Sequence, residues 1–537
     1  MWGMPLLASL LGGAGGNSAM CLEWLRLPFV LTTRSRVCFI SALLSCVILP
    51  AFGQEATIVG TITDPSGSLL PGATITATNI ETGQTQTVAT NASGGYVIPG
   101  LPVGHYSLKG EAAGFKTMEQ NGIALNVGDR VRLDFRMQLG LVEEAITVEA
   151  AAAKIETESG EVSSVVTGPQ VTQLATNGRS IYTLANLTPG SSSDQADFNP
   201  PTAVGGDSNV SFNGLRVAHN LYMLDGSETY DRGGGGASDV MPSLDAIAEF
   251  RMLTSNYSAE YGVSSAATMS AVLRTGTKRF HAMAWEFLRN DALDARNYFN
   301  RAPTPVAELR FNTFGFNVGG PVPFKDKDNP RTFFFYNMEW RRLIQGQTLS
   351  WNVPLASQYP DASGAGTGAV FAVPIRVPSG VVGLAANCPG GIPPDGIVPG
   401  HSFPNNTPPC MIDANAKSLL AAGIFPKPTN GNQFIGGNNV PTNVTEEIVR
   451  IDHQFNKKLS VFGHYVQENV TQNFGSTLWT GSVPTIGDTL ISPSYSAVVH
   501  TIHTLSPDLL NEVAFNYNGN RNGIVPQGII NSTYSFN

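Results

Sequence analysis

Beyond Lys278 the chain alternates apolar and polar residues with the period of two that marks a β-strand. "VRIDHQF" (449–455) and "EVAFNYN" (512–518) show the pattern clearly. In "TFFFYNMEWRR" one face carries Thr332, Phe334, Tyr336, Met338 and Trp340, and the other carries Asn337, Glu339 and Arg341. An aromatic face opposite a strongly polar face is typical of a transmembrane barrel wall around a wet lumen. A soluble β-sandwich, which also alternates, is the alternative.

Seven strands are predicted in this half of the chain. They lie near 280–289, 309–320, 331–342, 446–455, 459–468, 494–505 and 509–518. The second, fourth and sixth connections are short, and the others, which include the 103 residues of 343–445, are longer. This alternation fits short periplasmic turns and long outer loops. Because plugged transporters have about 22 strands, seven cannot close a barrel, and we expect a fragment that ends during an outer loop.

Residues 57 to 137 have a different pattern, which predicts short strands separated by turns rich in glycine and proline. "GATITATN" alternates threonine with apolar residues, and Ser93-Gly94-Gly95 marks a turn. The pattern predicts a small β-sandwich over residues 54–138. These residues resemble the carboxypeptidase regulatory-like domain, whose fold is similar to starch-binding-like sandwiches. The matching positions are Gly60, Asp64, Gly67, Pro71-Gly72-Ala73, Gly95-Tyr96, Leu101, Gly104, Tyr106 and Gly114-Phe115.

Despite that family's name, nothing here supports zinc peptidase chemistry, because no H-x-x-E with a later histidine is present. The resemblance leaves two roles open for the sandwich. It is a periplasmic spacer in the simpler interpretation and a glycan-binding module in the other.

A β-prone run, "EEAITVEA", follows within residues 139–154. It is a linker strand, or a peptide that adds to the sheet edge of a partner through main-chain hydrogen bonds. The run resembles the TonB box of outer-membrane receptors. The resemblance implies contact between a TonB-type inner-membrane protein and Glu144, Ala145, Ile146, Thr147, Val148 and Glu149.

Residues 155–277 predict a small α+β domain. Pro169 suits the first turn of a helix that stops at Asn177-Gly178. Ile181, Leu184 and Leu187 then share one face of a second short helix. "MPSLDAIAEFRMLTSNYSAEYG" predicts a further helix and a strand, and "AATMSAVLRTGT" closes the unit.

This domain resembles the plug of Oar-like TonB-dependent receptors, and 278–537 resembles the first strands of their barrel. The plug matches are Asn177-Gly178-Arg179, Pro189-Gly190, Asn213-Gly214, Asp225-Gly226, Ile247, Glu249-Phe250 and Tyr257 to Gly262. The barrel matches include "FNTFGFNVGGPVPFKDKDNPRTFFFYNMEWRR" and "RIDHQFNKKLSVFGHY". Ala267 and Ala271 stand where the family pattern has Gly and Asn.

Asp225 follows an apolar run, where a carboxylate could act as an acid or base. No histidine or second carboxylate is placed nearby in sequence to form a catalytic pair with it, so we interpret Asp225-Gly226 as a tight turn. His453, His464, His500 and His503 are scattered over strands, and His500 and His503 face opposite sides, which argues against a metal site. We therefore expect no catalytic residue, metal or cofactor.

Composition and charge exclude one class of binding partner. The net charge of −9 argues against nucleic acid, which needs a basic surface. Only 14% of residues are charged and 57 are glycine, as expected for an all-β or outer-membrane protein. The fold class is thus mainly β: a sandwich, an α+β plug and the first strands of a barrel.

The first 53 residues predict export. Arg34 and Arg36 precede the apolar run "VCFISALLSCVILP" and the small-x-small site Ala51-Phe52-Gly53, which together form a signal peptide. Residues 1–33 lie upstream of that complete signal and suggest a start codon placed too early. Cys46 as a lipid acceptor is the alternative. After cleavage, Cys388 and Cys410 are left to form one disulfide in a surface loop.

The function predicted from these features is TonB-dependent receptor or transporter activity in the outer membrane. As the resemblance implies, the ligand binds the outer loops and plug. The sequence does not distinguish between an oligosaccharide, a siderophore and a peptide as that ligand. The alternatives are a carbohydrate-binding adhesin or surface-assembly protein without transport, and, third, a peptidase.

Overall fold

A computed structural model defines the fold. It describes residues 55–140, 145–149, 158–193, 210–233, 238–296, 306–322, 330–353, 426–474, 487–506 and 509–527. The predicted signal peptide and both Cys388 and Cys410 lie outside them. Within these ranges, no helix has the length and apolar character needed to cross a bilayer.

The N-terminal strands form two sheets around one apolar core. One sheet has the order β4-β1-β7 with β8 also on β1, and the other has the order β3-β2-β5-β6-β9. Their bounds are β1 Ala56–Thr63, β2 Thr74–Asn79, β3 Thr85–Ala89, β4 Gly95–Leu101, β5 Gly104–Glu111, β6 Thr117–Leu125, β7 Arg130–Arg132, β8 Phe135–Arg136 and β9 Ala145–Glu149. Ile58, Ile75, Ile98 and Leu108 are fully buried between the sheets. The predicted sandwich is confirmed as a fold, and we call it the sandwich.

The residues that carried the regulatory-like resemblance have structural roles in the sandwich. The hydroxyl of Tyr96 donates to the carbonyl of Leu133 at 2.5 Å, and that of Tyr106 donates to the carbonyl of Pro102 at 2.8 Å. A Cβ at position 60 would lie 1.8 Å from the Leu133 carbonyl oxygen, so only glycine fits there. The Asp64 carboxylate accepts hydrogen bonds from its own turn.

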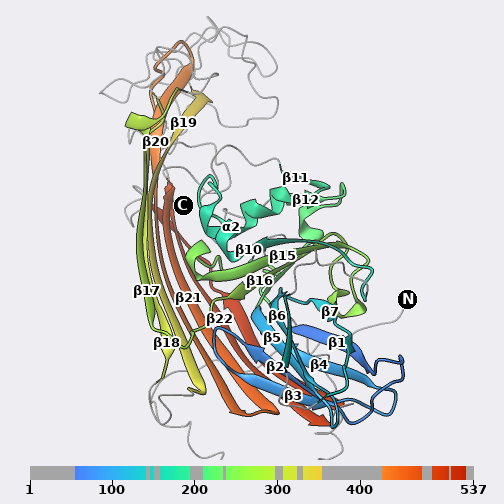
Figure 1. Ribbon diagram of the computed structural model, residues 1–537. Coiled ribbons are helices and arrows are strands. Elements are labelled where there is room, and N and C mark those ends of the chain that lie inside the picture. Colours follow the sequence, from blue (N-terminus) through green and yellow to red (C-terminus); the bar gives the residue numbers. More distant parts are fainter. Residues whose placement is uncertain are drawn as a thin grey trace, which may run out of the picture. The chain divides into compact units, whose positions relative to one another are not determined.

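The following segment, residues 158–277, is called the plug segment. Its main sheet has the order β10-β15-β16-β13-β14, with β10 at one edge (Figure 1). The strands are β10 Val162–Thr167, β11 Ser191–Ser193, β12 Val210–Phe212, β13 Leu221–Leu224, β14 Ser227–Glu228, β15 Ile247–Ser255 and β16 Thr268–Leu273. The helices are α2 Gly168–Gln173 and the 3₁₀ turns η1 Ile181–Leu187, η2 Val217–His219, η3 Leu244–Ala246 and η4 Ala259–Tyr261.

The predicted helices of the plug segment are shorter than expected. The first ends at Gln173 instead of reaching Asn177, and the helix expected after Met241 is a single 3₁₀ turn. The second is also 3₁₀, and its Leu187 is exposed while Ile181 and Leu184 are buried. Positions i, i+3 and i+6 stay on one face of a 3₁₀ helix, and Leu187 is exposed at its last residue, where the element ends.

All seven predicted strands of the C-terminal half form one antiparallel sheet, which we call the wall (Figure 1, yellow to red). Its order is β17-β18-β19-β20-β21-β22-β23, with β24 also on β22. The bounds are β17 His281–Asn290, β18 Leu309–Pro321, β19 Thr332–Asn352, β20 Gln433–Asn456, β21 Leu459–Phe474, β22 Gly487–Ser506, β23 Leu509–Asn520 and β24 Gly523–Gln527, with a 3₁₀ turn η5 Asp291–Leu293 after β17. Short and long connections alternate along the wall as predicted.

The two faces of the wall differ as the alternation predicted. Asn337, Glu339 and Arg341 are buried on one face, while the alternate residues of β19 are only half-buried. On the other face, aromatic rings lie side by side across strands, as where Phe314 stacks on Trp340 with ring centroids 5.5 Å apart.

One prediction needs correction. The connection expected over residues 343–445 begins only after Asn352, because β19 and β20 pair in continuous register out to Asn352 opposite Gln433. The sequence there lacks clean alternation, which explains why the ends of these two strands escaped prediction.

Candidate functional site: polar contacts between the plug segment and the wall

The plug segment and the polar face of the wall share one apolar core. Phe335, Ile448 and Val466 of the wall are fully buried in the same cluster as Phe250 and Met269 of the plug segment. Two groups of buried charged residues interrupt this core. Because buried charges are costly unless paired, these groups are the candidate functional site.

The first group is built on the tight turn predicted at Asp225-Gly226. Asp225 has φ 46° and Gly226 has φ 82°, and Leu224 pairs with Ser227 across the turn. Two positive φ angles define the hairpin turn that Asp-Gly favours, so the predicted turn is confirmed. The left-handed backbone directs the Asp225 side chain toward the wall, where the side chain is 1% exposed.

Three groups donate hydrogen bonds to the Asp225 carboxylate. Arg450 Nη1 lies 2.8 Å from Oδ1, His464 Nδ1 lies 2.7 Å from Oδ2, and the backbone N–H of Leu273 lies 3.0 Å from Oδ1. Arg450 also pairs with Asp452 at 2.9 Å. We call Asp225, Arg450 and His464 the Asp225 latch, because it joins the plug segment to β20 and β21.

The ionisation of Asp225 follows from these partners. Burial acts to raise its pKa, but the Arg450 charge and the hydrogen bond from His464 outweigh burial and lower it. The carboxylate is therefore ionised at neutral pH, and it accepts a hydrogen bond from His464 Nδ1–H. Nε2 of the same ring lies 3.0 Å from Ser496 Oγ.

Ser496, His464 and Asp225 thus follow the order of a hydrolase triad. Ser496 is 0% exposed, so no substrate carbonyl can reach its hydroxyl in this structure. The histidine that contacts Asp225 is supplied by the fold from 239 residues away in the sequence. The arrangement holds the plug segment and performs no hydrolysis.

The second group, the Arg341 cluster, places one guanidinium among three carboxylates of the wall. Arg341 pairs with Glu339 at 2.7 Å, Glu468 at 3.1 Å and Glu446 at 3.2 Å, and all four side chains are at most 3% exposed. Trp285 Nε1 also donates to Glu339 at 3.1 Å.

The plug segment meets this cluster with uncharged groups. Arg341 Nη2 donates to the Met241 carbonyl at 2.9 Å, Ser243 Oγ donates to Glu339 at 2.7 Å, and the Ser243 N–H donates to Glu446 at 3.1 Å. The two contacts therefore differ in kind, because the latch uses a charge of the plug segment and the cluster uses mainly its backbone.

The turn between β6 and β7 of the sandwich contacts the plug segment through a third buried group. The Val127 N–H donates to Glu249 Oε2 at 2.6 Å, and Arg251 donates to the Val127 carbonyl. Arg251 also lies 3.6 Å from Asp129. Glu249 and Arg251 are both 3% exposed, so β15 holds this turn with two buried charged side chains.

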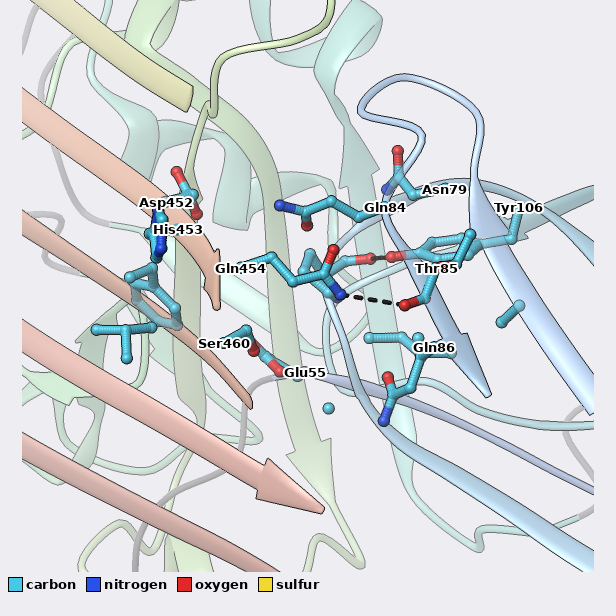
Figure 2. Close-up of a pocket in the computed structure, with 16 residues that line it drawn as sticks. Glu55, Asn79, Gln84, Thr85, Gln86, Tyr106, Asp452, His453, Gln454 and Ser460 are labelled. Carbon is cyan, nitrogen blue, oxygen red and sulfur yellow. Dashed lines mark hydrogen bonds between the residues drawn. The ribbon is translucent and has the colours of Figure 1, made fainter. Parts of the chain in front are cut away.

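A small pocket lies between the sandwich and strands β20 and β21 (Figure 2). Its volume is about 60 Å³, and Gln454 Nε2 donates to the Thr85 carbonyl across it at 3.1 Å. Burial and the nearby Glu512 carboxylate raise the pKa of Glu55, which also lines it. Ligand sites for small molecules are roughly 300–1,000 Å³, so this pocket suits waters only.

The residues predicted as sites have the following positions. The run predicted to be β-prone forms β9, Ala145–Glu149, and Glu144 lies just outside the described residues. His464 and His500 are buried while His503 is half-buried on the opposite face. His453 contacts Thr332 at 2.7 Å. Among the described residues, no group of three or more His, Cys, Asp or Glu side chains could hold a metal ion.

Comparison with known proteins agrees with this fold. Residues 272–536 match the outer membrane beta barrel domain, and residues 57–138 match the carboxypeptidase regulatory-like domain. The fold and these matches define an outer-membrane β-barrel protein with an N-terminal regulatory-like sandwich. The chain is 28% identical over 292 residues to the TonB-dependent transporter Oar of Myxococcus xanthus. The chain is thus similar to a TonB-dependent outer-membrane transporter, in agreement with the Oar-like resemblance seen in the sequence.

The match covers 52% of this chain and 26% of the length of Oar. Among solved structures, the outer membrane transporter YddB of Escherichia coli is similar with a TM-score of 0.41 and 9% identity, over 66% of this chain and 39% of that one. A ferric enterobactin receptor of Pseudomonas aeruginosa is similar with a TM-score of 0.34 and 7% identity, over 67% and 46% of the two chains.

Proposed function

We propose that this chain is an energy-coupled outer-membrane transporter in which the plug segment is held closed against the wall by the Asp225 latch and the Arg341 cluster. The observation that supports this proposal most is the burial of these charged groups at the contact. Removing one partner from such a pair costs about 3–5 kcal/mol, because the other charge is left buried without compensation. Opening separates all of these groups together, and in this proposal an external source of work drives it.

The pulling force acts on residues 139–154, which precede the plug segment and which we call the connector. Residues 145–149 form a strand, and a strand can join the sheet of a TonB-type inner-membrane protein through its main chain. Strand β10 is the next strand of the chain after residues 145–149, so a pull on these residues is transmitted along the chain to β10. Similarity to the TonB-dependent transporter Oar supports this partner.

The remaining features complete the proposal. The chain is exported by the signal in residues 1–53, and Cys388 and Cys410 form a disulfide on the cell surface. The ligand binds outer loops and the plug segment, and it is an oligosaccharide, a siderophore or a peptide. No cofactor takes part.

The test deletes residues 143–150 from the full-length protein in its own host. Binding and uptake of candidate ligands of the three classes are then measured on intact cells. Transport predicts that uptake is lost while surface binding is retained. The matched single-residue variants are Ile146→Pro, within the connector strand, and Ala152→Pro, beyond it. Only Ile146→Pro should abolish uptake.

An adhesin or surface-assembly protein without transport gives a different result. In that case cells bind a carbohydrate, accumulate none, and lose nothing on deletion of residues 143–150. That outcome would refute the transport proposal.

A further inference from the structure

The segment assigned above to an inner-membrane partner already has a partner within the chain. Strand β9 pairs in parallel with β6 of the sandwich, with Thr117 opposite Ala145, Glu119 opposite Thr147 and Asn121 opposite Glu149. It is the last strand of the five-stranded sheet β3-β2-β5-β6-β9.

The chain is guided onto this edge before β9 begins. The Lys116 N–H donates to the Gln138 carbonyl at 2.8 Å, and the Gly140 N–H donates to the Gly114 carbonyl at 3.2 Å. Phe115 and Leu139 form an isolated bridge between these bonds. The residues before β9 thus already follow the chain that leads into β6.

Strand β6 would be an edge strand without β9. An open edge presents a row of unpaired N–H and C=O groups, which proteins usually cover. In this sheet the connector covers it, and it does so by main-chain pairing. Main-chain pairing is also how an extended peptide joins the sheet of a partner.

We propose that the sandwich is an internal clasp, which binds residues 145–149 on its β6 edge and withholds them from the TonB-type partner. This proposal rests on the proposed function, because it assigns a regulatory contact to the same five residues. While β9 is clasped, one of its edges is occupied by β6. A pull on it is then borne by the sandwich and does not reach β10.

The fraction of time that the clasp is closed depends on the short link between β8 and β9. Only eight residues separate the end of β8 at Arg136 from the start of β9 at Ala145, so the connector stays near β6 at high effective concentration. The apparent affinity of an outside partner falls in proportion to the fraction of connector that is free. A clasp closed nine-tenths of the time therefore weakens the partner's binding about tenfold.

The clasp is also linked to the plug segment. Strand β6 ends at Leu125, two residues before Val127, whose N–H and carbonyl are held by Glu249 and Arg251 of β15. A shift of β15 on ligand binding therefore moves the turn at the end of β6. This contact provides a physical route by which an occupied plug segment could open the clasp.

The experiment closes the clasp covalently in the full-length protein. Glu119→Cys and Thr147→Cys are introduced together, because paired residues of neighbouring strands lie at about the Cα separation that a disulfide spans. The probe is the purified periplasmic domain of the TonB-type protein from the same cells. Its affinity for the receptor in detergent is measured before and after oxidation, and again after reduction.

We expect oxidation to weaken binding at least tenfold and reduction to restore it. The matched control is Thr76→Cys with Lys109→Cys, which links β2 to β5 within the same sheet and leaves β9 untouched. Oxidation of this control should leave the affinity unchanged. The parent protein, with its own Cys388 and Cys410, is oxidised in parallel.

The complementary variants are Glu119→Pro and Gln120→Pro. Adjacent N–H groups of a strand point to opposite edges, so one of the two removes a bond to β9 and should tighten probe binding severalfold. If the oxidised variant carrying both Glu119→Cys and Thr147→Cys binds the probe as tightly as the parent, the clasp does not withhold the connector and the inference is overturned.

The deletion of residues 143–150 separates this failure from failure of the proposed function. Binding of the probe that survives the deletion shows that the partner does not use the connector, which refutes the function itself. Binding that is lost on deletion but unaffected by the disulfide refutes only the clasp.

Discussion

Asp225 Oδ2 accepts a hydrogen bond from His464 Nδ1 at 2.7 Å, although 239 residues separate the two in the chain. The pair joins a two-residue turn of the plug segment to the middle of the wall. Both side chains are at most 1% exposed, so water does not screen the contact. The strength of plug closure should therefore depend on this pair far more than on any surface ion pair.

Replacing Asp225 by asparagine should loosen the plug segment. The change leaves the Arg450 guanidinium buried without its partner on the turn, at a cost of about 3–5 kcal/mol. Hydrogen exchange of residues 221–229 in the detergent-solubilised protein should accelerate accordingly. Asp294→Asn, at an exposed aspartate, is the matched control and should leave exchange unchanged.

Replacing Arg341 by methionine should weaken the second contact. Glu339, Glu446 and Glu468 would then repel one another in a buried site without a cation, and the Met241 carbonyl would lose its donor. Limited proteolysis should cut the plug segment faster than in the parent. Arg310→Met, which removes an arginine with a 60% exposed side chain, should not change the cleavage rate.

The loop before Met241 should respond to mild acid. Burial, together with the Asp231 and Glu228 carboxylates, raises the pKa of Asp239 to about 6. A raised carboxyl pKa means that the folded state binds the proton more tightly than the unfolded chain. Its contribution to stability is therefore complete below about pH 4 and lost as the pH rises through 6.

Exchange of residues 227–233 and 238–240, corrected for intrinsic rates, should thus be slower at pH 5 than at pH 7. Asp239→Asn should remove this difference. Asp64→Asn should retain it, because hydrogen bonds from Ser66 and Ser68 lower the pKa of Asp64, which therefore does not titrate in this range. An unchanged pH response in Asp239→Asn would assign the effect to another group.

A charge on the outer face of the wall should oppose insertion into the membrane. Val499 is 52% exposed at the middle of β22, and its neighbours Val498 and His500 are buried on the other face. Arginine near the bilayer midplane costs about 2–4 kcal/mol. Val499→Arg should fold poorly into lipid vesicles, as judged by electrophoretic mobility without heating, while Val499→Leu should fold like the parent.

The contact between the sandwich and the plug segment should depend on Glu249. Changing it to alanine removes the acceptor of the Val127 N–H. Exchange of residues 126–129 should accelerate, while that of residues 74–79 in the sandwich interior should stay slow. Equal acceleration in both ranges would mean that the whole sandwich is destabilised.

Much of the fold could be predicted from local pattern. The wall strands alternate clearly except at the far ends of β19 and β20, so most of their positions followed from the side-chain period alone. The Asp225-Gly226 turn followed from the backbone preference of two residues. The short helices of the plug segment were predicted less well, because a single 3₁₀ turn leaves too few residues to show its period.

The latch and the cluster could not be predicted in the same way. Asp225, Arg450 and His464 are far apart in sequence, and nothing local to any of them indicates the others. The available signal was the inward position of Arg341 and Arg450 on otherwise alternating strands, since a charge on the polar face of a wall needs a counter-charge. Which residue supplies it depends on how the plug segment packs.

The position of β10 has a mechanical consequence. It is an outer strand of its sheet and is held to β15 by six residue pairs, with an irregularity at the first of them, Val162. Tension applied from the N-terminal side reaches this ladder before it reaches the turn at Asp225. The plug segment should therefore unfold in steps. Strand β10 separates from β15, starting at Val162, while the contacts of Asp225 with the wall are still intact.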